Sequence, residues 1–331
     1  MRFSTGLLRT FALLTFTSLL AHAQSCTNPS IRREWRQLSD DDKQAFHSAT
    51  LCLRNRPSQR YEEDAVTTRA DDLTWTHVVL SEQQMIHWVA NFLPWHRMLL
   101  AEHERMLREE CGYGGPYPYW DWTIDADANA VPTSPIWDSR TGFGGNGAST
   151  GRSEAGYQKC VTDGPYSNLT LTVGAPPFAR DPNMPHCLLR EWNNGQRDSN
   201  GEWVVGTMNP SGYSSQRVAQ ATGHSNYHDF SAALEGGPHS AVHNVVSGDM
   251  SNYFAPNDPI FFMHHANIDR IWAQWQGNDV ARLSDYSGFN DARRTQPASI
   301  DDALPALDLI DGEPRVRDYM DTRAGNMCYV Y

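Results

Sequence analysis

Two groups of histidines constrain this chain of 331 residues more than any other feature of its sequence. The first group is His77, His87 and His96, and the second is His239, His243 and His265. Imidazole is a ligand that suits copper, and a site built only from imidazoles leaves open positions on the metal. Three histidines per ion, twice over, therefore predict a pair of copper ions that can hold dioxygen between them.

Two other interpretations of these histidines were weighed. A single buried histidine is more often a hydrogen-bonded core residue than a ligand, and His103, two turns beyond His96, is the strongest competitor among the remaining histidines. Zinc usually takes four ligands, often with cysteine or carboxylate among them, so two histidine triplets fit zinc poorly.

The first residues have the features of a secretory signal. Arg2 and Arg9 precede or flank an apolar run over residues 13–20, and Ala21-His22-Ala23 resembles a cleavage site. The run is shorter than the ~20 residues that a membrane-spanning helix needs. We therefore expect residues 1–23 to be a signal peptide and residues 24–331 to form one secreted domain without a membrane anchor.

Charge and cysteine content narrow the partners and the compartment. The net charge is −12 with the acidic residues scattered, which argues against nucleic acid or an anionic membrane as a partner. Six cysteines, all beyond the signal, predict three disulfides, among which we expect Cys160 with Cys187 because they bracket a Gly/Pro-rich insertion. The sequon at Asn168 predicts a surface glycan.

Helical patterns cover residues 40–53, 81–91, 94–110, 238–247 and 259–276. Ser81 with Gln84 predicts a capping box at the start of the second segment. The stretch from 125 to about 226, rich in Gly, Pro, Ser and Asn, predicts long loops with a few short strands rather than a second domain. The predicted fold is thus mainly α, a four-helix bundle whose core holds the binuclear site.

These helices predict where the ligands of the first group lie. His87 and His96 would stand on consecutive helices separated at Pro94, and His77 would lie in the approach to the first of them, on a loop. Tryptophans are expected in the core, namely Trp88, Trp95, Trp120, Trp122, Trp272 and Trp275.

The second group shares one helix face and one ambiguity. His239 and His243 stand at i and i+4, about one turn apart. His264 and His265 are adjacent on a helix, so at ~100° per residue only one points well at a metal, and periodicity does not choose between them. Asp121 and Asp269 are expected to orient ligand rings or to cap helices.

The motifs around these histidines resemble those of tyrosinases, catechol oxidases and haemocyanins, a family of binuclear copper proteins. The matching segments are FLPWHR after His87, PYPYWDW at residues 116–122, and NDPIFFMHHANIDRIWAQW from Asn257. The resemblance runs from about Arg32 to the C-terminus, with both histidine blocks in the family's order. In that pattern the second histidine of the HH pair takes the copper, which implies His265. Phe261, one turn before it, is grouped with the substrate gate.

The resemblance also implies a reaction, the oxidation of small phenols with dioxygen. Relatives that hydroxylate monophenols often carry Asn directly after the first ligand of the second copper and pair it with a Glu that orders a water. This chain has Ser240 at that position, Glu235 as the candidate Glu, and Asn244 after the next ligand. Tyr253 and Phe254, both bulky, lie where relatives place residues at the mouth of the site. These differences favour a secreted oxidase of the catechol-oxidase type, which converts o-diphenols to o-quinones.

Two alternatives stay open on the sequence. One is a tailoring oxidase that acts on a phenol or tyrosyl group of a secondary metabolite or small peptide. The other is a haemocyanin-like oxygen carrier with the same coppers. Met85 stands where many relatives have a cysteine crosslinked to the second ligand, so no thioether is expected. The C-terminal Tyr329-Val330-Tyr331 resembles the motif that closes the catalytic domain, so no inhibitory lid is expected after it.

Overall fold

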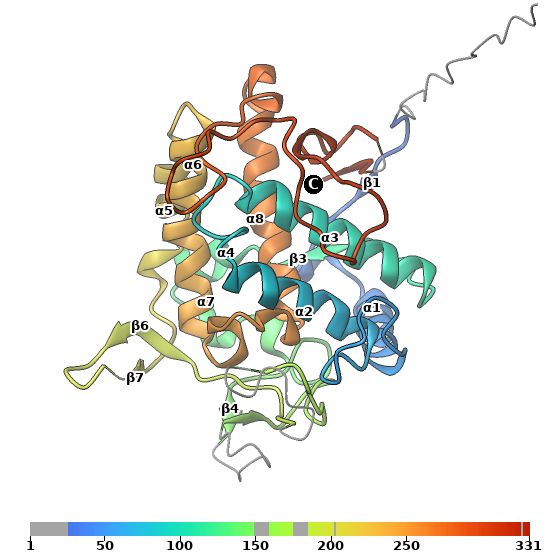
Figure 1. Cartoon of the computed structure of the whole chain (residues 1–331). Coiled ribbons are helices and arrows are strands. Elements are labelled where there is room, and N and C mark those ends of the chain that lie inside the picture. Colours follow the sequence, from blue (N-terminus) through green and yellow to red (C-terminus); the bar gives the residue numbers. More distant parts are fainter. Residues whose placement is uncertain (1–25, 149–158, 175–184, 202, 326) are drawn as a thin grey trace, which may run out of the picture.

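Helices form most of the regular structure. The computed structural model describes residues 26–148, 159–174, 185–201, 203–325 and 327–331. The helices are α1 (Asp40–Asn55), α2 (Arg69–Glu82), α3 (Phe92–Glu109), α4 (Trp122–Asp127), α5 (Ser215–Thr222), α6 (Tyr227–Leu234), α7 (Ser240–Val246) and α8 (Ile260–Gly277). In Figure 1, α7 and α8 run steeply through the molecule, and α2 and α3 lie across them. This arrangement confirms the predicted mainly α fold with four central helices.

The second helix differs from its prediction. The helix expected over residues 81–91 is wrong, because α2 begins at Arg69 and ends at Glu82. Its start is a capping box in which the Thr68 hydroxyl accepts from the Asp71 backbone N–H and the Asp71 carboxylate accepts from that of Thr68. Beyond Glu82 the chain cannot stay helical, because Gln84 and Trp88 have φ values of +57° and +61°.

The other long helices follow their local signals closely. Helix α1 begins after Ser39, whose hydroxyl accepts from the Asp42 N–H. Helix α3 ends before Gly112, which has a φ of +71°. Helix α8 begins beside Asp258, whose carboxylate accepts from the Ile260 N–H at 3.1 Å. The predicted helix over 238–247 is present as α7, preceded by a π-helical turn, Glu235–His239.

Short strands pair in four two-stranded sheets. The pairs are β1 (Ser30–Ile31) with β8 (Tyr329–Val330), β2 (Arg33–Glu34) with β3 (Pro118–Tyr119), β4 (Gly147–Ala148) with β5 (Cys160–Val161), and β6 (Asn193–Arg197) with β7 (Trp203–Val205). The first two pairs are parallel and the others antiparallel. Within residues 125–226 the predicted short strands are present. Helix α5 and the second half of α4 lie there too and were not predicted, because each helix is too short to give a clear periodic pattern.

Three disulfides hold the described part of the chain. They join Cys26 with Cys328, Cys52 with Cys111, and Cys160 with Cys187, so the predicted last pair is confirmed. The predicted signal over residues 1–23 lies outside the described residues. None of the described helices is long and apolar enough to cross a membrane.

The core is rich in tryptophan, with one exception to the prediction. Five of the six expected core tryptophans are fully buried, namely Trp95, Trp120, Trp122, Trp272 and Trp275. The prediction is wrong for Trp88, whose side chain is 69% exposed. Its left-handed backbone, outside any helix, turns this indole away from the core.

Candidate metal centre

The first histidine group comes from two helices and the segment between them. His77 lies inside α2, His96 lies in the first turn and a half of α3, and His87 lies in the irregular connection between these helices. Their ligand atoms all lie within 4.8 Å of one another. The predicted placement is therefore wrong for two residues: His77 lies on a helix and His87 on a loop, because α2 ends before His87.

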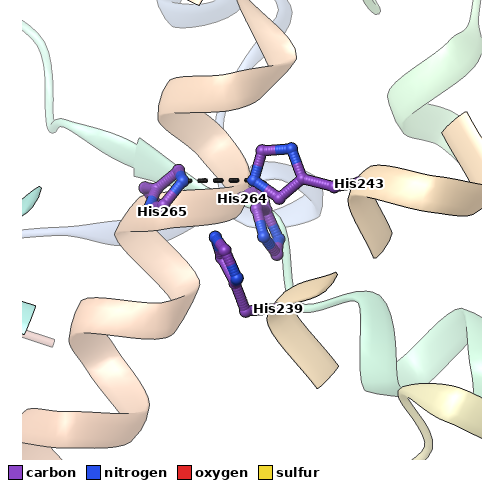
Figure 2. Close-up of side chains that lie close together, drawn as sticks. All are labelled: His239, His243, His264 and His265. Atoms are coloured by element: carbon purple, nitrogen blue, oxygen red, sulfur yellow. Dashed lines mark hydrogen bonds between the residues drawn. The ribbon is translucent and has the colours of Figure 1, made fainter. Parts of the chain in front are cut away.

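The second group comes from α7, the π-helical turn before it, and α8. His239 ends that turn, His243 lies one helical turn later, and both His264 and His265 lie on α8. Figure 2 shows the four rings converging on one space, and their ligand atoms lie within 4.8 Å of one another. Nε2 of His243 and Nε2 of His265 are 3.3 Å apart. The ring of His265 also stacks on His96 of the first group, with centroids 4.2 Å apart. The two groups are therefore direct neighbours.

Hydrogen bonds set the tautomer of four of these rings. The Nδ1 atoms of His77, His96, His239 and His243 lie 2.6, 2.7, 3.2 and 2.5 Å from the backbone carbonyls of Tyr253, Phe92, Glu235 and Met250. A carbonyl only accepts, so each Nδ1 carries the proton and each Nε2 keeps a free lone pair. The Nε2 atoms of His77, His96 and His239 are buried and have no hydrogen-bond partner. These are the atoms that a metal would bind.

A hydrogen bond also distinguishes the two adjacent histidines on α8. The indole N–H of Trp122 donates to Nδ1 of His264 at 3.2 Å. Because an indole can only donate, Nδ1 of His264 is the acceptor and the single ring proton of the neutral imidazole lies on Nε2. That nitrogen has no lone pair to offer a metal. The contact supports His265 as the third ligand and His264 as a residue behind the ligands.

The electrostatic environment keeps the rings neutral. Burial lowers the pKa of His77 to about 3 and that of His243 to about 4. Burial, together with repulsion from neighbouring histidines, lowers the pKa of His87, His96, His239 and His265 well below the ordinary value. Neutral imidazole is the form that coordinates metals, so both groups are ready to bind an ion near neutral pH.

Two phenylalanines pack against both histidine groups. The ring of Phe261 lies 4.2 Å from His265 and 5.2 Å from His77. The ring of Phe92 lies 4.7 Å from His239 and 5.0 Å from His96. Both are fully buried, so they exclude water from the inner side of the histidines. Sequence reasoning missed Phe92, although it stands one turn before His96 as Phe261 stands one turn before His265.

A pocket of about 640 Å³ opens onto the histidines from the outside. Its lining includes His77, His87, His239 and His243. Of the expected gate residues, Tyr253 lines this pocket and is 49% exposed. Phe254 does not lie at the mouth: it is 2% exposed and packs in a separate cluster with Trp75 and Val78, because its side chain turns beneath α2. Phe261 lies under the histidines rather than at the mouth.

The three expected polar site residues lie near the pocket with different environments. Ser240 and Asn244 line it. The Ser240 hydroxyl donates to the backbone carbonyl of Glu235 at 2.7 Å. The Glu235 carboxylate accepts from the Trp88 backbone N–H at 2.7 Å, and burial raises the pKa of Glu235 to about 8. Ser240 and Glu235 thus meet through a backbone carbonyl and not through their side chains.

Of the two expected carboxylates, Asp121 has one of its predicted roles, as a helix cap, whereas Asp269 has neither predicted role. Asp121 caps α4, accepting from the Thr123 N–H at 3.3 Å, and it pairs with Arg270. Asp269 binds Arg97 and Arg32. Backbone carbonyls orient the ligand rings instead, a role that carries no side-chain signal in the sequence.

The donor atoms present fit copper. Both groups consist only of histidines, and the buried Nε2 atoms of His77, His96 and His239 have no hydrogen-bond partner among the described residues. A set of imidazoles without thiolate or carboxylate suits copper and leaves positions open for a further ligand. Two such groups in contact can accommodate two ions side by side.

Comparisons with known proteins identify relatives of the whole chain. Residues 67–278 match the common central domain of tyrosinase. The chain is 39% identical to the tyrosinase-like protein phomQ1 of Diaporthe leptostromiformis, covering 93% of this chain and 79% of that protein. It is 34% identical to the tyrosinase ustQ of Aspergillus flavus, over 97% of this chain and 87% of that protein. The structure is similar to that of a polyphenol oxidase variant from Thermothelomyces thermophila, with a TM-score of 0.77 and 26% identity. The similarity covers 92% of this chain and 88% of that one.

Proposed function

Because the chain belongs to the tyrosinase family of type-3 copper proteins, we propose that it is an oxidase that converts o-diphenols to o-quinones with dioxygen. The observation that carries the proposal is the pair of adjacent all-histidine groups, in which the buried Nε2 atoms of His77, His96 and His239 have no hydrogen-bond partner among the described residues. Each diphenol gives up two electrons and two protons, and one dioxygen accepts the electrons of two diphenols to form two waters.

The ligands would divide by group. His77, His87 and His96 would hold one copper, and His239, His243 and His265 the other. When bound, the copper pair supplies the binding and reduction of dioxygen. The protein holds the ligand rings through backbone carbonyls, and Phe92 and Phe261 keep water away from the inner side of the site. The pocket beside Tyr253 admits the phenol from the other side.

Diphenols are favoured over monophenols because, among the described residues, the Ser240 and Glu235 side chains are not paired to hold a basic water. A monophenol must lose a proton whose unperturbed pKa is near ~10, so assistance from a general base matters. The Ser240 hydroxyl is engaged by a backbone carbonyl, and the Glu235 carboxylate is engaged by the Trp88 N–H. Neither group is directed at a shared water as the Asn and Glu of monophenol-hydroxylating relatives would be.

The direct test is oxygen consumption by the copper-loaded protein with catechol. We expect steady uptake of one dioxygen for two quinones formed, with copper-free protein as the control. An oxygen carrier would instead bind dioxygen reversibly and leave catechol unchanged. That result would exclude the proposed activity.

Ser240→Asn should raise activity on monophenols relative to diphenols. An amide at this position can hold a water with Glu235, and general-base assistance is worth about 10²–10⁴-fold. We expect a rise toward the lower end of this range, because Glu235 also keeps its contact with Trp88. The measurement is the ratio of initial rates on tyramine and dopamine at equal copper content.

Ser240→Ala is the matched control, since it removes the same hydroxyl without adding an amide. Its rate ratio should stay at the wild-type value. A wild-type ratio near one would mean that the site already deprotonates monophenols, and the interpretation of Ser240 would be wrong.

A second candidate is the oxidation of a phenol carried by a larger molecule. The size of the pocket favours it, since a single phenol ring fills only part of about 640 Å³. Assays of catechols with progressively longer substituents separate the two candidates, because a tailoring oxidase should prefer the longer ones. Secretion is proposed with either candidate, because three disulfides suit an oxidising compartment.

A further inference from the structure

One tryptophan beside the metal centre is exposed, unlike the five tryptophans that are fully buried in the core. Trp88 directly follows His87 in the chain and is 69% exposed. A large apolar ring left in water gives up the free energy that its burial would provide. Because Trp88 lines the pocket above the histidines, its ring is available to contact a bound substrate.

The conformation of Trp88 is also unfavourable on local grounds. Its φ of +61° is uncommon for a bulky residue and is kept only where the surroundings impose it. The surroundings are visible here: the Trp88 N–H donates to the buried Glu235 carboxylate at 2.7 Å. A Cβ at Gly236 would lie 3.3 Å from Cζ3 of the indole, so the ring rests on a backbone that has no side chain there. The ring is thus held in place although little covers it.

Trp88 is shared by the linings of two pockets. Trp88 lines the pocket above the histidines and also a neighbouring pocket of about 120 Å³, which includes Val89, Tyr227 and Phe289. A substituent that leaves a phenol ring in the first pocket toward the second must therefore pass over the indole. Asp291 and Arg294, which also line the second pocket, have opposite charges, so this pocket does not select strongly for an ionic group.

We propose that Trp88 is a specificity-determining residue, a stacking platform that selects diphenols whose ring carries a flat, conjugated substituent. One side of the indole rests on Gly236, the ring is 69% exposed, and planar π-systems stack on an exposed aromatic face in offset geometry. The proposal rests on the proposed function for the identity of the phenol, but the stacking itself does not depend on turnover.

The test compares Trp88→Ala with wild type on three catechols of similar length. Methyl 3,4-dihydroxycinnamate has a flat substituent, 4-butylcatechol a flexible apolar one, and dopamine a cationic one. Loss of the indole should raise KM for the cinnamate by about 2- to 10-fold, the range of one aromatic contact, and raise KM less for the other two. The kcat should change less than KM, because the ring does not touch the reacting oxygens.

Three further variants make the result specific. Trp88→Phe keeps a π-face and should restore most of the preference for the cinnamate. Trp88→Gly removes the ring and tolerates a positive φ, so it serves if the alanine variant is unstable. Ile124→Ala removes another exposed apolar side chain, 49% exposed and absent from the lining of either pocket, and should behave as wild type.

Binding of methyl cinnamate, which has no phenol and cannot be turned over, separates this proposal from the function. Calorimetry should give a Kd that rises about 2- to 10-fold in Trp88→Ala and stays constant in Ile124→Ala. Equal KM changes for all three catechols, or an unchanged Kd, would overturn the role of Trp88. A protein that binds methyl cinnamate through Trp88 but does not oxidise any catechol would contradict the proposed function. The stacking role of Trp88 would not be contradicted by that result.

Discussion

His265→Ala is expected to lower the copper content from two ions per chain to one and to reduce catechol oxidation to the background of copper-free protein. In the proposed ligand set, His265 would supply one of three nitrogens to the second copper, and its Nε2 lies 3.3 Å from Nε2 of His243. A pair of imidazoles binds copper less tightly than three, and the two ions must both be present to share one dioxygen. Elemental analysis after removal of loosely bound metal, paired with oxygen uptake, measures both effects.

His264→Ala is the matched control on the neighbouring residue. Its Nδ1 accepts from Trp122, which leaves the ring proton on Nε2, and we therefore propose that this ring is not a ligand. Loss of a residue behind the ligands typically weakens metal binding by about 10- to 100-fold, so two coppers should remain when the metal is supplied in excess. The reverse pattern, copper lost with His264→Ala and kept with His265→Ala, would show that the wrong histidine was assigned.

Asp269→Ala should destabilise the folded protein by about 3–5 kcal/mol, because it removes the carboxylate that pairs with buried Arg97 and leaves buried Arg32 with Glu104 alone. Asp269 is 2% exposed and accepts from Arg97 at 2.5 Å and Arg32 at 3.2 Å. The hydroxyls of Tyr329 and Tyr331 donate to it at 2.6 and 2.5 Å. This carboxylate therefore ties α3 and α8 to both ends of the described chain. Urea unfolding with the disulfides intact measures the loss.

The matched control is Asp311→Ala. Asp311 pairs with Arg60 at 2.6 Å, but its side chain is 89% exposed. Exposed ion pairs contribute little, so this variant should unfold close to the wild-type midpoint. Equal losses of stability in the two variants would contradict the importance of the buried network.

The same carboxylate predicts an acid limit to stability. Burial alone would raise the pKa of Asp269, but Arg97 and Arg32 overcome it and hold the pKa below its ordinary value of 3.8. A lowered pKa in the folded state stabilises the fold above the pKa of the unfolded state, and this stabilisation is lost as the pH falls through the folded value. Below about pH 4, wild type should lose stability more steeply than Asp269→Asn, which has no carboxyl to protonate.

Local patterns in the sequence predicted several of the long helices and the kind of site. The starts predicted at residues 40 and 259 lie within one residue of the observed starts of α1 and α8, where Ser39 and Asp258 accept from backbone N–H groups of the first turn. The i, i+4 spacing of His239 and His243 is likewise a local property of one helix. Cys160 and Cys187 were paired correctly because they close a short insertion.

Contacts between distant segments decided the orientation of the histidine rings and the surroundings of the pocket. Nδ1 of His77 is held by the carbonyl of Tyr253, 176 residues away, and the tautomer of His264 depends on Trp122, 142 residues away. Hydrophobic periodicity cannot report such contacts, because it describes one face of one element at a time. The exposure of Trp88 and the burial of Phe254 follow from backbone turns that carry no strong residue signal. The histidine spacing determined that a metal pair could form, whereas tertiary packing decided which nitrogen of each ring faces it and what surrounds the pocket.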